Sequence, residues 1–348
     1  MEEEASALLR TLDSQIEGSR GGTCVVDMKE ECISTVFDIL CKSLLDTPSR
    51  RGGDGAMSVM AGFDSKSFLE AQNSSLRESM RTVNNPFRFL MVWSAERRKA
   101  LQSRERLRQL GANMLQNYRA ATEGNEEWAT QDQSIMGYLV RHNYPSEQHR
   151  ISDLIIFLIA GHETTAMSLS FFLLCMAQNP SCREKLQQEL DAAMGPNEVP
   201  SLNTVSGLEY FSWCYKEVQR LYPVAPVVGR QVLDSDIVYN DMLIPKHSIV
   251  AVNLYAIGRQ RWIDRRDEFL PERWRADNPQ ATALKDLLMP FSIGKRACIG
   301  QNLAVMEMKL LAAMLLRNFE FDLIGKVEYE LFVTLKPKDL RMSVRRRL

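Results

Sequence analysis

The stretch that decides the fold is Phe291-Ser-Ile-Gly-Lys-Arg-Ala-Cys298-Ile-Gly300, near the C-terminal end of a chain of 348 residues. It predicts a glycine-punctuated loop that leads into a helix from about Ile299 to Leu316. Backbone N–H groups and the helix dipole favour an anion at a helix start, so we expect Cys298 to be held as a thiolate. Gly294 allows a tight turn, and Gly300 lets a flat group approach the backbone closely.

Arg296 lies two residues from this sulfur, where its forked guanidinium could hold a carboxylate. A thiolate that binds a metal, next to a cation that binds carboxylates, suits a flat cofactor with carboxylate groups and a metal, such as haem. The pattern Phe-x-x-Gly-x-Arg-x-Cys-x-Gly resembles the haem-binding signature of the cytochrome P450 monooxygenases. The resemblance implies haem b, with Cys298 as the axial iron ligand, Arg296 on a propionate and Phe291 shielding the sulfur, in a loop shaped by Gly294 and Gly300. From the residues alone, the alternative is an inert buried cysteine in an ordinary loop–helix turn.

Composition limits the class of protein. Hydrophobic residues make up 45% of the chain and charged residues 25%, which is typical of a soluble protein with a sizeable core. The 43 basic and 44 acidic side chains leave a net charge of −1, so the overall charge suggests no nucleic-acid partner. Seven scattered cysteines without a Cys-x-x-Cys pair argue against a disulfide framework or a zinc ribbon and favour a reducing compartment. The acidic start Met1-Glu-Glu-Glu is unlike a signal peptide.

The first part of the chain predicts helices with one short strand. Apolar side chains recur at helical spacing from Glu2 to about Ile16 and from Lys29 to Leu45, with a strand at 24–28 between them. Residues 47–65 are rich in Gly, Ser and Arg and predict a long surface loop, and residues 123–133 predict another loop.

A long apolar helix is predicted at the centre of the chain, from about Ser152 as its N-cap to Asn179, ended by Pro180. Its length could span a bilayer, but its middle carries the polar patch Gly161-His-Glu-Thr-Thr165, which a lipid environment disfavours. We therefore prefer a buried core helix. The zinc motif His-Glu-x-x-His is excluded, because its second histidine is replaced by Ala166.

This polar patch resembles the oxygen-activating motif of the cytochromes P450. The resemblance implies that Ala160 and Gly161 leave space for O2, while Glu163 and Thr164 supply a carboxylate and a hydroxyl that relay protons. From the residues alone, the patch could instead be a polar cap over a cavity that holds water.

The region 68–121 is helical in pattern, interrupted at Asn84-Asn-Pro86, and contains a basic run from Arg97 to Arg108. This run could meet an acidic lipid or partner, but a solvated helix face is the favoured interpretation. The sequence Trp93-x-x-x-Arg97 imitates a family motif that holds a haem propionate. It lies too close to the central helix for that role, so we interpret it as the start of a surface helix.

Glu217 and Arg220 lie three residues apart on a helix predicted over 208–221 and so share one face. An exposed pair of this kind would mean little. The family resemblance implies that both join Arg273 in an ion-pair network that serves folding and haem retention. It also implies that Arg230 reaches a propionate, and that the substrate cavity is lined by Val227, Val228, Phe332 and Val333.

The final third of the chain predicts strands within 237–255, around the turn pair Asn240-Asp241, and within 319–321 and 331–344. Two positions depart from the family pattern: His247 replaces a usual glycine, and Gly258 replaces a frequent histidine. Neither residue takes part in the expected chemistry.

The expected fold is mainly α with small β-sheets, a cytochrome P450 fold in one domain over residues 1–348 that lacks the family's N-terminal helices and first sheet strands. The implied function is haem-dependent monooxygenation of an apolar small molecule by O2, by hydroxylation or epoxidation, with electrons from a reductase or ferredoxin. We expect a reducing compartment, no nucleic-acid partner and no transmembrane segment in this chain; family members usually reside at the endoplasmic reticulum membrane or in an organelle. The alternative is a non-catalytic truncated remnant with weak or no haem binding.

Overall fold

The computed structural model describes residues 1–44, 65–91, 93–124, 130–195 and 198–347. The chain divides into two compact units. One comprises Met1 and Ser34–Glu163, and the other comprises Glu2–Ile33 and Thr164–Leu348. The single-domain expectation over residues 1–348 stays a prediction. Almost all of the loop expected over 47–65, and the middle of the one over 123–133, lie outside the described residues.

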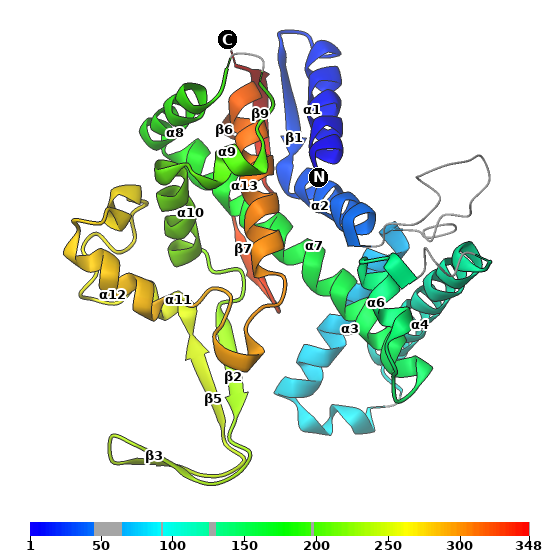
Figure 1. Ribbon diagram of the computed structural model, residues 1–348. Helices are drawn as coiled ribbons and strands as arrows, with labels where there is room; N and C mark the ends of the chain where they lie inside the picture. Colours follow the sequence, from blue (N-terminus) through cyan, green and yellow to red (C-terminus); the bar gives the residue numbers. More distant parts are fainter. Residues whose placement is uncertain (45–64, 92, 125–129, 196–197, 348) are drawn as a thin grey trace. The chain divides into compact units, whose positions relative to one another are not determined.

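The unit formed by Ser34–Glu163 is helical. It contains the later part of α2 (Met28–Leu44), α3 (Ser65–Asn84), the short 3-10 helix η2 (Pro86–Leu90), α4 (Ala95–Thr122), α6 (Ile135–Arg141) and the first half of α7 (Glu147–Gln178) (Figure 1). The α-helices share one apolar core, to which each contributes buried side chains such as Phe37, Phe68, Tyr118, Leu139 and Leu158. Burial of these apolar side chains is the main force that holds the helices together.

The interruption between α3 and α4 is fixed by two caps. The Asn85 side chain accepts the Phe87 N–H at 3.1 Å and so begins η2. The Ser94 side chain accepts the Arg97 N–H and so begins α4. Trp93 is exposed immediately before this helix, as expected for the start of a surface helix. The sequence therefore placed the break correctly.

Helix α7 begins at Glu147, earlier than expected. Ser152 is not its N-cap, because the Ser152 hydroxyl donates to the Gln148 carbonyl at 2.7 Å from within the helix. Among the described residues, α7 is the one helix long and apolar enough to cross a bilayer, and half of its most apolar window is buried. In its second half every residue from Thr165 to Met176 except Ser168 is buried, as in a core helix.

The other unit is built around α13 (Gln301–Asn318), whose residues from Glu307 to Leu316 are all buried. Helix α1 (Glu2–Glu17) packs on α13 and strand β9 (Arg341–Arg346) through apolar residues such as Leu8 and Leu12. The remaining helical elements are α8 (Pro180–Ala193), α9 (Leu202–Ser206), α10 (Glu209–Leu221), α11 (Leu254–Ile257), η3 (Pro271–Trp274), α12 (Pro279–Leu287) and η4 (Gly294–Arg296).

Small antiparallel sheets complete this unit. β9 lies between β1 (Thr23–Asp27) and β6 (Phe319–Leu323), with Thr23 opposite Arg345. The other pairs are β2 (Val227–Gln231) with β5 (Ile249–Asn253), β3 (Ile237–Tyr239) with β4 (Met242–Ile244), and β7 (Tyr329–Leu331) with β8 (Leu335–Pro337). The expected fold class, mainly α with small β-sheets, is confirmed.

Two turns in these sheets contain residues with positive φ angles, and these angles restrict which amino acids fit there without strain. Asn240 and Asp241 have φ angles of 45° and 63°, which is the backbone of a two-residue hairpin turn and which Asn and Asp tolerate better than most residues. His247 has a φ of 67°. A glycine would adopt that conformation without strain, so the departure noted at this position has a local conformational cost.

Candidate functional site

The cysteine loop joins α12 to α13 and closes on itself through backbone hydrogen bonds. The Cys298 N–H donates to the Phe291 carbonyl at 2.8 Å, and the Ala297 N–H donates to the Gly294 carbonyl at 3.0 Å. Gly294 has a φ of 72°, so the turn requires glycine for conformational reasons rather than for space. The loop thus has a defined path that presents Cys298 just before α13.

Cys298 is the exposed cysteine of this protein, whereas the other six are buried. Burial raises the pKa of the Cys32 and Cys41 thiols to about 12, which makes them inert. The Cys298 Sγ atom lies 4.0 Å from the point where a Cβ on Gly300 would stand, and Gly300 is the N-cap of α13. The sulfur therefore lies beside the N-terminal end of a long helix.

Two arginines lie on or against the cysteine loop. The Arg230 Nη2 atom, from β2, donates to the Ser292 hydroxyl at 2.6 Å, and its Nη1 atom donates to the Gly229 carbonyl. Arg296 is exposed and, within the described residues, has no hydrogen-bond or ion-pair partner. The side chains of Ile293 and Ile299 on the same loop are 66% and 87% exposed. The loop therefore offers one sulfur, two guanidinium groups and apolar surface.

The expected proton-relay residues lie in the middle of α7. Glu163 is half-buried, and its Oε2 atom accepts a hydrogen bond from Gln72 Nε2 of α3 at 3.0 Å. Gln72 is buried, and sequence reasoning missed it because no spacing rule links it to α7. Thr164 is half-buried in the other unit, where its carbonyl accepts the Ser168 hydroxyl. The roles of Glu163 and Thr164 stay predictions.

The residues around this patch are tightly packed. His162 is buried, its Nδ1 atom lies 2.7 Å from the Leu158 carbonyl, and its ring meets Phe37 edge-on. Burial lowers the His162 pKa, so the ring is kept neutral. A Cβ on Gly161 would lie 2.8 Å from the Leu40 side chain. Leu40 therefore packs directly against Gly161, and Ala160 lies exposed next to it. The role of Ala160 and Gly161 in leaving space for O2 stays a prediction.

The pair expected at Glu217 and Arg220 is fully buried on α10. Glu217 accepts both Nε and Nη2 of Arg220, at 2.9 and 2.7 Å, in a bidentate pair. The Arg273 Nε atom, from η3, lies 3.3 Å from the same carboxylate. The Leu270 N–H and the Trp274 indole N–H complete its hydrogen bonds, at 3.0 and 2.9 Å.

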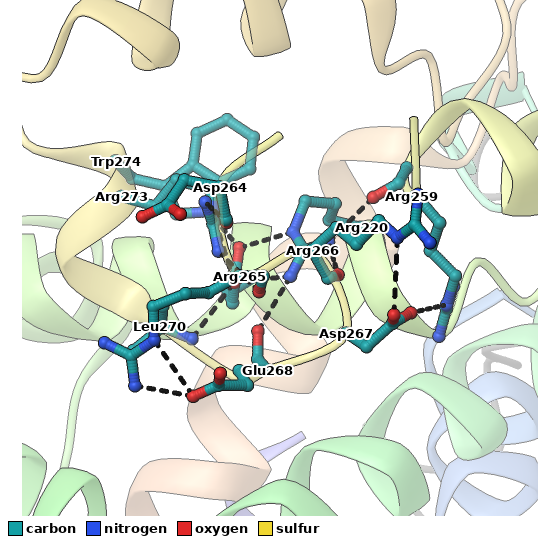
Figure 2. Close-up of polar contacts among 12 residues, drawn as sticks. Arg220, Arg259, Asp264, Arg265, Arg266, Asp267, Glu268, Leu270, Arg273 and Trp274 are labelled. Carbon is teal, nitrogen blue, oxygen red and sulfur yellow. Dashed lines mark hydrogen bonds and ion pairs between the residues drawn. The ribbon is translucent and has the colours of Figure 1, made fainter. Parts of the chain in front are cut away.

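The loop over 258–268 surrounds these two arginines, and Figure 2 shows its backbone wrapped around Arg220 and Arg273. Arg220 donates to the carbonyls of Gly258, Arg266 and Glu268 at 2.6 to 2.9 Å, so all five of its N–H groups have acceptors. A Cβ on Gly258 would stand 2.3 Å from the Arg220 carbonyl oxygen. The absence of a side chain at this position is therefore a steric requirement of the cluster, which sequence reasoning missed.

The residues expected to meet substrate lie on two elements. Val227, exposed, and Val228, half-buried, belong to β2. Phe332 and Val333 form the turn between β7 and β8, where the Phe332 N–H donates to the Thr334 carbonyl. The Leu335 N–H donates to the Val224 carbonyl, which ties β8 to the chain just before β2. Their contact with a substrate stays a prediction.

Comparison with known proteins shows which family the chain belongs to. The family model Cytochrome P450 matches residues 1–342. The chain belongs to the cytochrome P450 family. Among curated relatives, it is 37% identical over 183 residues to Cytochrome P450 3A41 of Mus musculus and 36% identical over 185 residues to Cytochrome P450 3A2 of Rattus norvegicus. These matches cover 52% and 53% of the chain but 36% of each relative, so the match spans about a third of their length.

Solved structures agree on the fold. The crystal structure of a cytochrome P450 named CYP102L1 has a TM-score of 0.77 at 22% identity, covering 99% of this chain and 73% of that one. The haem domain of cytochrome P450DA gives a TM-score of 0.79 at 22% identity, with the same coverage. At this identity the likeness shows the fold alone.

Members of the cytochrome P450 family bind haem b as a haem-thiolate centre. The residues of the cysteine loop fit such a group. Cys298 offers an accessible sulfur at a helix start, Arg296 has uncommitted donors for a carboxylate, and Ile293 and Ile299 offer apolar surface for a macrocycle.

Proposed function

We propose that this chain is a haem-dependent monooxygenase that inserts one atom of O2 into an apolar organic substrate by hydroxylation or epoxidation. The second oxygen atom leaves as water, and the reaction consumes two electrons and two protons. A reductase or ferredoxin is the proposed donor, delivering electrons at the Cys298 face. The observation that carries the proposal is the accessible sulfur of Cys298 in a closed loop at the start of α13.

Haem would supply the activation of O2, and the protein residues would hold it and its surroundings. Cys298 would bind the iron through Sγ, while Arg296 and Arg230 would each neutralise a propionate. The hydrogen bonds that the Phe291 and Gly294 carbonyls accept from the Cys298 and Ala297 N–H groups keep the sulfur in one position before any ligand arrives. Such preorganisation favours ligation because little conformational freedom is lost on binding.

The proposed proton relay rests on neighbouring side chains of α7. The Glu163 carboxylate would hold and pass a proton, and the Thr164 hydroxyl would carry it onward. Gln72 is the positioning residue, because its Nε2 donor fixes the Glu163 Oε2 atom from a buried site on α3. The substrate would be apolar because the residues proposed to meet it, Val227 and Phe332 among them, offer hydrocarbon or aromatic surface.

The test is a difference spectrum of the purified chain, reconstituted with haem, reduced and exposed to carbon monoxide. Thiolate ligation predicts a strongly red-shifted Soret band. Cys298→Ser should abolish this band, whereas Cys24→Ser, a matched change in β1, should leave its position unchanged. A chain that takes up no haem, or a Cys298→Ser variant with the same band, contradicts the proposal and supports the non-catalytic alternative.

A further inference from the structure

A cavity of about 580 Å³ opens between α3 and α4, within the unit formed by Ser34–Glu163. The two helices pack along each other and are joined by η2 (Figure 1). Arg104 of α4 ties them together, because its Nε and Nη2 atoms donate to the hydroxyls of Ser75 and Ser79 on α3, at 3.3 and 3.1 Å. These hydrogen bonds hold the cavity walls in place, and they do not involve the charged side chains that line the cavity.

Four basic side chains line this cavity. Arg77 and Arg81 come from α3, four residues apart and hence on one helix face, and Lys99 and Arg106 come from α4. In the part of the chain that the structure describes, Arg81, Lys99 and Arg106 have no ion-pair partner within 4.0 Å. No close ion pair therefore holds these three side chains away from a ligand, although the charge of Arg81 also acts on Glu96.

Three acidic residues also line the cavity, and one of them is matched by an ion pair outside the lining. Glu78 is buried and accepts Arg88 at 2.8 and 2.9 Å in a bidentate pair, so its charge is already matched. Glu96 accepts the Ser94 hydroxyl at 2.6 Å; that hydrogen bond first, and the charge of Arg81 to a smaller extent, lower its pKa, so Glu96 keeps its negative charge. Glu70 remains as the acidic side chain without such a partner among the described lining residues. The lining therefore presents four basic side chains against two carboxylates, Glu70 and Glu96, so positive charge is in excess.

We propose that the cavity between α3 and α4 binds a phosphate-bearing small molecule with at least two phosphate groups. Like charges gathered in a concave surface focus a positive potential, and a polyanion relieves their mutual repulsion. Arginine matches the geometry of phosphate oxygens, and lysine adds a point charge. The volume lies in the usual range for small-ligand pockets, and Asn73 and Gln102 provide amides for the rest of the ligand.

The first experiment is calorimetric titration of the full chain with inorganic pyrophosphate at low salt. We expect binding that weakens as salt is raised, because charge is the main attraction. The double variant Lys99→Gln/Arg106→Gln should bind at least about tenfold more weakly, which is a loss of about 1.4 kcal/mol. The matched control is Arg108→Gln on the same helix. Arg108 is exposed, pairs with Glu105 and does not line the cavity, so affinity should stay within about twofold, a difference smaller than a single surface ion pair.

The second experiment separates a soluble ligand from a lipid headgroup. Phosphatidylcholine vesicles that contain phosphatidylinositol bisphosphate are sedimented with the chain and with both variants. Sedimentation that the double variant loses indicates a headgroup, and pyrophosphate binding without sedimentation indicates a soluble ligand; both support the site. Absence of pyrophosphate binding together with absence of variant-sensitive sedimentation overturns the proposal. So does an equal loss of binding in the Arg108→Gln control. Far-UV circular dichroism and melting of each variant verify that the substitutions leave the fold intact.

Discussion

Replacing Glu217 by glutamine removes the carboxylate that Arg220 and Arg273 share, without changing the size of the side chain. In the native cluster this carboxylate accepts five hydrogen bonds, two from Arg220 and one each from Arg273, Leu270 and Trp274. Glutamine has one acceptor oxygen, and its amide N–H groups face donors. The two arginines remain charged, because a guanidinium does not lose its proton in a protein.

The loss of folding stability follows from the burial of the charged side chains in this cluster. Glu217 and Arg220 are both 0% exposed, and the Arg273 side chain is 3% exposed, so water cannot replace the lost charge. Breaking a buried ion pair by removing one partner costs about 3–5 kcal/mol, because an uncompensated charge is left in the interior. Since whole domains are stable by roughly 5–15 kcal/mol, Glu217→Gln should remove a large part of the folding free energy.

The assay is unfolding in urea, followed by far-UV circular dichroism and tryptophan fluorescence. Trp274→Phe provides an intermediate reference, because it deletes one hydrogen bond to a charged acceptor, worth about 1.5–3 kcal/mol, and keeps every charge. Glu268→Gln is the matched control on the neighbouring loop. The Glu268 side chain is exposed and pairs with exposed Arg265, so this change should leave the unfolding midpoint where it was.

The expected order of destabilisation is Glu217→Gln, then Trp274→Phe, then Glu268→Gln. If Glu217→Gln unfolds at the same urea concentration as Glu268→Gln, the carboxylate is not balancing buried charge and the reasoning is wrong. If Trp274→Phe is the more damaging of the two, packing of the indole matters more than the ion pairs.

Three further predictions rest on single residues. Gly258→Ala should destabilise the fold by about 1–3 kcal/mol in the same assay, since its Cβ would overlap the Arg220 carbonyl; Gly207→Ala, which meets only ordinary contacts, should not. Burial raises the pKa of Glu307 from 4.5 to about 8, so the folded state retains a proton that the unfolded chain releases, and stability falls as the pH rises between these values. Glu307→Gln should abolish this slope and exceed the native chain in stability at pH 8, by on the order of several kcal/mol; equal slopes would contradict the burial argument. Thr164→Ala should leave the carbon-monoxide spectrum intact, divert electrons to hydrogen peroxide and lower product formation by on the order of 10²-fold; unchanged coupling of electrons to product would refute the relay.

Several features could be predicted from the sequence because they depend on neighbours along the chain. The Glu217–Arg220 pair follows from helical spacing, and the turn at Asn240-Asp241 follows from two residues that tolerate positive φ. The cysteine loop is local as well: its glycine at 294 has the positive φ that the pattern suggested. Local rules were sufficient in these places.

Other features depend on contacts between distant segments, which spacing cannot reveal. Gln72 meets Glu163 across 91 positions of sequence, and the Trp274 indole meets Glu217 across 57. Leu40 fills the space beside Gly161 because α2 packs there, and a helical pattern does not specify which side chain will occupy a neighbouring gap. The start of α7 was misplaced for a different reason. A serine before an apolar run matches a cap, although its hydroxyl can equally bond back within a longer helix.

The way in which Arg220 is held has a consequence for how this protein can change over generations. Its three partners in the loop over 258–268 are main-chain carbonyls, which every amino acid possesses. Side chains at Arg266 and Glu268 can therefore be exchanged freely while the same acceptors persist, provided that the chain keeps its path. Selection on this loop should act on backbone shape, through residues such as Gly258, and leave its outward-facing chemistry free to diverge.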